Sequence, residues 1–181
     1  LLLALSLTAC TSAFRKAMDR GDAYAQVGQW DQAVAAYAEA VRLDPDDETA
    51  QRKLAEAKAG AAADRVKEGK ALLAADEPVR AMRPFHQAMA LDSANIEAKN
   101  GYAEARGATL KLGEEAYAAQ NPKRAVQLAR AVLELEPSDA DARSLESRGA
   151  EKATAMALAR AEAHLAAERH SHALVDVGEA L

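Results

Sequence analysis

The chain has 181 residues, of which half are hydrophobic but only 4% are aromatic, so its apolar content comes largely from Ala, Leu and Val. This composition suits close-packed helices, because alanine has the highest helix propensity and lets backbones approach each other. The net charge of −5 and the lack of any Lys and Arg cluster exclude a nucleic-acid-binding protein, which needs basic side chains to neutralise phosphates.

The chain opens with an apolar, uncharged stretch from Leu1 to Ala9 that leads into the only cysteine, Cys10. The stretch is too short to span a bilayer, because a spanning helix needs about 20 residues. The segment Leu7-Thr8-Ala9-Cys10 resembles the end of a bacterial lipoprotein signal peptide. This resemblance implies a truncated signal peptide over residues 1–9, lipid attached to Cys10 and a linker over residues 10–13. The alternative is an apolar helix start with a buried cysteine.

The same resemblance indicates a location in the cell. Thr11 follows the cysteine where an aspartate would favour retention in the inner membrane, so we expect an outer-membrane lipoprotein that faces the periplasm. No Met or basic segment precedes Leu1, and the last repeat stops at Leu181. We therefore expect the sequence to be cut at both ends.

Residues 21–45 have the pattern of a helical hairpin. Gly28 and Gln29 interrupt an apolar run of helical period, Asp31 can cap the helix that follows, and Pro45 stops it. We expect Trp30, at the corner between the two helices, to brace the turn rather than to bind a ligand.

This pattern returns three times. A small residue leads each copy, an alanine follows twelve residues later, and further core positions follow after sixteen and nineteen residues. The leading residues are Gly21, Gly69, Gly113 and Ala161, and the alanines are Ala33, Ala81, Ala125 and Ala173. The later positions are Tyr37, Phe85, Ala129 and Val177, and then Ala40, Ala88, Val132 and Ala180.

These residues resemble the tetratricopeptide repeat (TPR), a helix–turn–helix unit of about 34 residues. The resemblance implies that small residues pack where two helices cross, that an aromatic lies on the second helix, and that a proline ends the unit. The packing residues that it implies are Gly21, Tyr24, Ala33, Tyr37, Ala40, Pro45, Gly69, Ala81, Phe85, Ala88, Gly113, Ala125 and Pro137. The implied repeat domain covers residues 14–181, with repeats at about 14–47, 62–95, 106–139 and 154–181, the last of them truncated.

The spacing between copies departs from a plain array. The leading residues stand 48, 44 and 48 residues apart, which exceeds a repeat of about 34 residues by about 14, 10 and 14. Residues 46–75 and 94–119 keep an apolar face at helical spacing, so we expect lengthened first helices. The predicted fold is all-α, a TPR-like right-handed solenoid of antiparallel hairpins.

Local signals support these helices. Asp46 and Asp47 precede one predicted long helix, and Ser138 and Asp139 precede another, at positions where a helix start favours negative charge and capping. Pro78 and Pro122 stand where Trp30 stands in the first copy, and proline is accepted in the first turn of a helix. Pro84 falls inside a predicted second helix, which we expect it to bend or shorten.

Motifs for chemistry are missing. The sequence has no glycine-rich phosphate loop, no paired cysteines and no serine in a nucleophile elbow, so we expect no enzyme and no cofactor. The nearest approach to a metal site is His164, His170 and His172 with Glu168, which we interpret as surface residues because a zinc site needs three or four convergent ligands.

The expected function is protein binding without catalysis. Stacked repeats leave a concave groove that can hold an extended peptide or a helix, and we expect no small-molecule substrate. Some TPR proteins clamp the C-terminal carboxylate of a partner with Lys and Asn side chains on successive first helices. We expect no such clamp here, because the positions that match it are mixed and partly acidic: Met18, Asp22, Val66, Lys70, Leu110 and Glu114. Two alternatives stay open, the front of a larger protein with a catalytic domain beyond residue 181, and a soluble co-chaperone.

Overall fold

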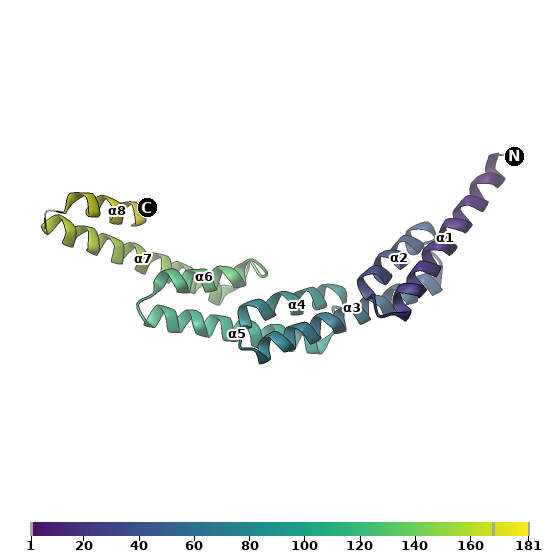
Figure 1. Cartoon of the computed structure of the whole chain (residues 1–181), viewed down its shortest axis with the longest axis horizontal. Helices are drawn as coiled ribbons and strands as arrows, with labels where there is room; N and C mark the ends of the chain where they lie inside the picture. The colour runs from purple at the N-terminus through teal and green to yellow at the C-terminus, as the bar shows by residue number, and fades with distance from the viewer. Residues whose placement is uncertain (1, 168, 181) are drawn as a thin grey trace. The chain divides into compact units, whose positions relative to one another are not determined.

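The structure is a computed structural model that describes residues 2–167 and 169–180, with side chains from residue 12 onward. Within these ranges every element is an α-helix, and short turns join the helices (Figure 1). The helices are α1 (Leu2–Gln26), α2 (Trp30–Leu43), α3 (Glu48–Ala74), α4 (Pro78–Leu91), α5 (Ile96–Ala118), α6 (Pro122–Leu133), α7 (Ala140–Ala166) and α8 (His170–Ala180). The prediction of an all-α fold built from helical hairpins is confirmed.

The odd-numbered helices are the long ones. They have 25, 27, 23 and 27 residues, whereas α2, α4, α6 and α8 have 14, 14, 12 and 11. The expected lengthening of the first helices is therefore confirmed, and α3 and α5 fill the ranges 46–75 and 94–119 almost completely. Helix α1 runs through residues 10–13, for which we expected a linker. The side chains of the predicted signal peptide and of Cys10 lie outside the described part of the structure.

Side-chain caps begin the long helices. The side-chain oxygens of Asp47, Asn95 and Asp139 each accept a hydrogen bond from the backbone N–H three residues on, at 2.7, 2.9 and 2.8 Å. Such a bond satisfies one of the backbone donors that a helix start leaves without a partner. The capping expected from the Asp46–Asp47 and Ser138–Asp139 pairs thus belongs to the second residue of each.

The expected cap by Asp31 is wrong, and so is the expected shortening of α4 by Pro84. Asp31 does not cap α2, because the helix already begins at Trp30; its carboxylate instead accepts a hydrogen bond from Arg65 of α3 at 2.7 Å. Pro84 does not shorten α4, which has the same 14 residues as α2. Pro84 is buried, and it has no N–H to donate to the Arg80 carbonyl.

The turn inside each of the first three hairpins has one residue in the left-handed region. Gly28, Asp76 and Gln120 have φ of 73°, 58° and 60°, and they stand at the same position of successive copies. In each turn the next N–H donates to a carbonyl five residues back at 2.9 Å, for example from Gln29 to Tyr24. This pattern ends a helix and reverses the chain. Only the first copy uses glycine, which adopts this conformation without strain.

The chain divides into two compact units. One contains residues 1–71 and 84–101, and the other contains residues 72–83 and 102–181. In the first unit, a small core of Ala17, Ala40 and Ala50 joins α1, α2 and α3. In the second, Ala125, Ala129 and Leu145 join α6 to α7. No helix in the described part of the chain is both long and apolar enough to cross a membrane.

Candidate functional site

The helices of the first unit cross where glycines meet aromatic rings. A side chain at Gly21 would collide with the ring of Tyr37, and one at Gly69 would lie 2.7 Å from the ring of Phe85. On its other side, Phe85 faces Gly101 of α5. The ring is therefore held between two helices, which approach closely because neither carries a side chain at the contact.

The predicted packing residues fall into two groups. The alanines and rings are buried, and they are Ala33, Tyr37, Ala40, Ala81, Phe85, Ala88 and Ala125. Gly113 faces Leu145 and Ala125 of the second unit. In contrast, Tyr24, Pro45 and Pro137 are exposed. The two prolines fix the start of the next helix, because their carbonyls accept hydrogen bonds from the side chains of Gln51 and Arg143.

A second set of glycines in the long helices was not predicted. Gly60 lies under the Trp30 indole, Gly101 under Phe85, and Gly149 against Val126. Trp30 therefore packs on α3, the long helix that follows the first hairpin. The available signal was a glycine inside a helical pattern, which costs helix stability and usually has a packing reason.

Ion pairs connect successive long helices on the surface that we expected to bind partners. In the first unit Asp22 pairs with Lys53, and Lys70 pairs with Glu97 at 2.8 Å. Position 70 is the copy of position 22, 48 residues on, so α3 has a lysine where α1 has an aspartate. Each pair joins an acidic and a basic side chain of two successive long helices.

Two carboxylates that form ion pairs, Asp22 and Asp139, have lowered pKa values. The hydrogen bond from Lys53 is the main cause for Asp22, and the Tyr37 hydroxyl, 2.6 Å away, adds to it. For Asp139 the main cause is the hydrogen bond from Arg106, although burial of the carboxyl acts in the opposite direction. The same guanidinium contacts Asp141 at 2.7 Å. Burial and nearby carboxylates raise the pKa of Tyr102 to about 12.

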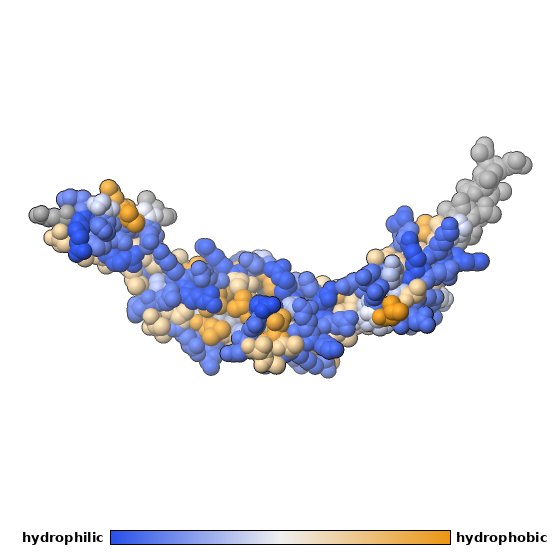
Figure 2. Space-filling model, in the orientation of Figure 1, coloured by the Kyte–Doolittle hydropathy of each residue, from blue (hydrophilic) through white to orange (hydrophobic). Residues whose placement is uncertain are grey.

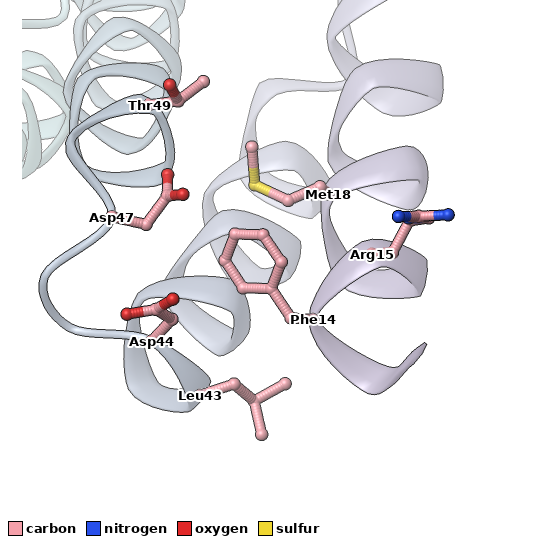
Figure 3. A pocket seen from close by; sticks show the side chains of 7 residues that line it. All are labelled: Phe14, Arg15, Met18, Leu43, Asp44, Asp47 and Thr49. Carbon is pink, nitrogen blue, oxygen red and sulfur yellow. The ribbon is translucent and has the colours of Figure 1, made fainter. Parts of the chain in front are cut away.

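The first unit has a pocket of about 470 Å³ beside residues 14–18 of α1 (Figure 3). Phe14 and Met18 from α1 and Leu43 from α2 give it an apolar side, and Asp44 and Asp47 give it an acidic one. A second pocket, of about 420 Å³, lies in the second unit, where Lys123, Arg160, Asp176 and Glu179 line it. Three ion pairs already link these four residues.

The histidines are partly brought together. The rings of His164 and His172 have centroids 5.3 Å apart, and Nε2 of His164 lies 3.4 Å from Oδ2 of Asp176. In the part of the chain that the structure describes, no three His, Cys, Asp or Glu side chains are placed to hold a metal ion. Glu168 lies outside that part.

The face of the molecule in Figure 2 is mainly hydrophilic, with small separate apolar areas. Among the exposed apolar side chains, the most exposed are Leu174 and Ile96, at 74% and 71%. The buried contacts are made mostly by alanine and glycine. Long polar side chains are therefore left to cover the outer surface of the hairpins.

One part of the chain matches a known protein family. Residues 21–60 match the protein family described as TPR repeat. The matched segment holds the end of α1, all of α2 and the first half of α3, with the Gly21–Tyr37 and Trp30–Gly60 contacts. No curated protein matches the chain. Among solved structures, the one titled "Crystal structure of MamA protein" is 18% identical over 94% of this chain and 91% of that chain, with a TM-score of 0.20.

Proposed function

We propose that the chain is a non-catalytic scaffold that binds a protein partner on its long helices, while lipid on Cys10 holds it in the bacterial cell envelope. The observation that carries the proposal is the repeated hairpin itself, whose first copy matches the TPR repeat over residues 21–60. Most of its buried side chains are alanines, so most of the longer polar side chains lie on the surface, where a partner can contact them.

The scaffold is tested by photo-crosslinking from chosen positions in living cells. A benzoylphenylalanine at Glu114 on α5, a half-exposed residue, should give one discrete adduct with a partner protein. The matched control is Arg130 on the short helix α6, which is 66% exposed and should give no such adduct. Equal adducts from both positions, or none from either, would contradict binding on the long helices.

The lipid anchor has its own test. Support for it comes from the segment Leu7-Thr8-Ala9-Cys10, in which the small Ala9 precedes the only thiol of the chain. Cells that express the protein should incorporate labelled palmitate into it, and the label should be lost in Cys10→Ala. Fractionation of the labelled protein should place it with the outer membrane. Label that persists in Cys10→Ala would remove the anchor from the proposal and leave the scaffold unaffected.

A further inference from the structure

The pocket of the first hairpin combines apolar and acidic walls. Phe14 and Met18 pack partly against the alanine core of α1, α2 and α3, and they leave one side open to the pocket. In Figure 3 the carboxylates of Asp44 and Asp47 lie across the space from Phe14, and Arg15 projects from α1 away from them. None of the ion pairs among the described residues involves Asp44 or Asp47.

In the third hairpin, the equivalent carboxylate is paired with an arginine of the chain itself. Gly21 and Gly113 stand 92 residues apart, and this shift carries Phe14 to Arg106, Asp47 to Asp139 and Thr49 to Asp141. There the Arg106 guanidinium forms ion pairs with both aspartates. Asp47 and Asp139 have the same local geometry, because each caps its helix through an N–H three residues on. The first hairpin therefore keeps the carboxylate and replaces the arginine with an aromatic ring.

We propose that this pocket binds an arginine side chain of a partner protein. The partner's guanidinium enters the pocket beside Phe14 and makes with Asp47 the contact that Arg106 makes with Asp139 in the third hairpin. Asp47 accepts its hydrogen bonds, Asp44 adds negative charge, and the face of Phe14 stacks on its plane. Met18 and Leu43 contact the alkyl stem and an apolar neighbour in the partner segment. This inference deepens the proposed scaffold function and rests on it.

Arginine fits the pocket better than lysine does. Its guanidinium is planar and weakly hydrated, so it can stack on Phe14 while its several N–H groups reach a carboxylate. A lysine ammonium is strongly hydrated and behaves as a point charge, so it gains less from the ring. The sign of the charge is set by the loop, which carries Asp44, Asp46, Asp47 and Glu48 within five residues. Opposite charge in the partner is therefore required for binding.

The experiment titrates the full chain with the peptide acetyl-Gly-Leu-Arg-Leu-Gly-amide and follows backbone amide signals by NMR. Signals of Phe14, Met18 and Thr49 should shift in the wild-type chain. The same peptide with citrulline, a neutral isostere of arginine, should bind about tenfold more weakly or not at all, and the lysine peptide should fall between them. Equal affinity for the arginine and citrulline peptides would overturn the proposal.

Two variants of one loop provide the matched control. Asp47→Asn removes the charge but keeps the helix cap, as Asn95 does in the second hairpin, and should weaken the arginine peptide about tenfold. Asp46→Asn removes a neighbouring charge outside the pocket lining and should change the affinity much less. Equal losses of affinity in both variants would show that the arginine peptide responds only to the overall negative charge of the loop, and would also overturn the proposal.

A double variant supplies the cation from within the chain. Phe14→Arg with Thr49→Asp copies Arg106, Asp139 and Asp141, and should abolish the peptide-induced shifts; shifts that persist in a folded variant contradict the proposal. If the variant does not fold, the citrulline comparison on the wild-type chain still decides. Failure of the arginine peptide alongside a normal adduct from Glu114 would reject this inference and leave the scaffold function standing.

Discussion

The position of the Phe85 ring determines which glycines of α5 tolerate a larger residue. It is fully buried, and it lies between Gly69 of α3 and Gly101 of α5. A methyl group at Gly101 would collide with atoms of the ring, which has no exposed space into which to move. Gly107, six residues later in the same helix, has nothing near the position of an added methyl group. The two glycines therefore predict opposite effects of one substitution.

We expect Gly101→Ala to lower the free energy of unfolding by about 1–3 kcal/mol, because it overpacks the contact with Phe85. Gly107→Ala should raise it by about 0.5–1 kcal/mol, because alanine restricts the unfolded chain and favours the helix. Urea unfolding followed by circular dichroism measures both. Equal effects of the two substitutions would contradict the packing of Phe85 between the helices.

The same ring shows what the sequence could and could not predict. The small residues and the aromatic were found from their spacing, because the copies repeat it. Spacing did not identify the neighbour of Gly69, however, whose nearest side-chain atoms belong to Phe85. Spacing along the chain places a residue on a helix face, but side-chain length decides which neighbour reaches it. For the same reason the spacing relates Phe14 to Arg106, but it does not show that Arg106 reaches Asp139 and Asp141.

At the level of helices, the start of α7 depends on a carboxylate with two roles. Asp139 caps the helix through Ala142 and pairs with Arg106 of α5, and its side chain is only 2% exposed. Caps of this kind were visible in the sequence, because Asp before an apolar run is a start signal. The ion pair was not, because it joins residues 33 positions apart. The length of α4 was misjudged because propensity alone ends a helix near an interior proline, whereas α4 continues past Pro84 to Leu91.

This ion pair predicts an acid-sensitive contact between α5 and α7. The pKa of Asp139 lies below its ordinary value of 3.8 in the folded chain, chiefly because of Arg106. The carboxylate therefore adds stability above about pH 3.8, and this contribution is lost as the pH falls through the lower folded pKa. Asp139→Asn keeps the cap but removes the charge.

We expect the variant to be less stable than the wild type at pH 6, and the difference to shrink at pH 3. Urea unfolding at the two pH values measures it. As a control, Glu48→Gln changes a carboxylate of the first unit for which the structure shows no ion pair, and it should show a smaller pH dependence. A difference between wild type and Asp139→Asn that stays constant with pH would contradict the ion pair.

At the scale of the molecule, each unit is stabilised by small clusters between neighbouring helices rather than by one central core. The buried side chains are distributed along the helices, and most of them are alanines. Ion pairs such as Asp22 with Lys53 and Lys70 with Glu97 also join successive long helices. Exposed pairs contribute little stability individually. The buried contacts between helices therefore contribute most of the stability.

Local stability should then follow how much each helix buries. Helices α6 and α8 have similar lengths, but α6 buries Pro122, Ala125, Leu128, Ala129 and Val132, whereas α8 buries only Ala173. Leu174 and Val175 of α8 are 74% and 66% exposed. We expect the amides of α8 to exchange with deuterium at least about tenfold faster than those of α6, because opening α8 uncovers little apolar surface. Leu174→Ala should leave both rates almost unchanged, whereas Leu128→Ala should accelerate exchange in α6. Equal protection of the two helices in the wild-type chain would contradict a stability that is assembled contact by contact.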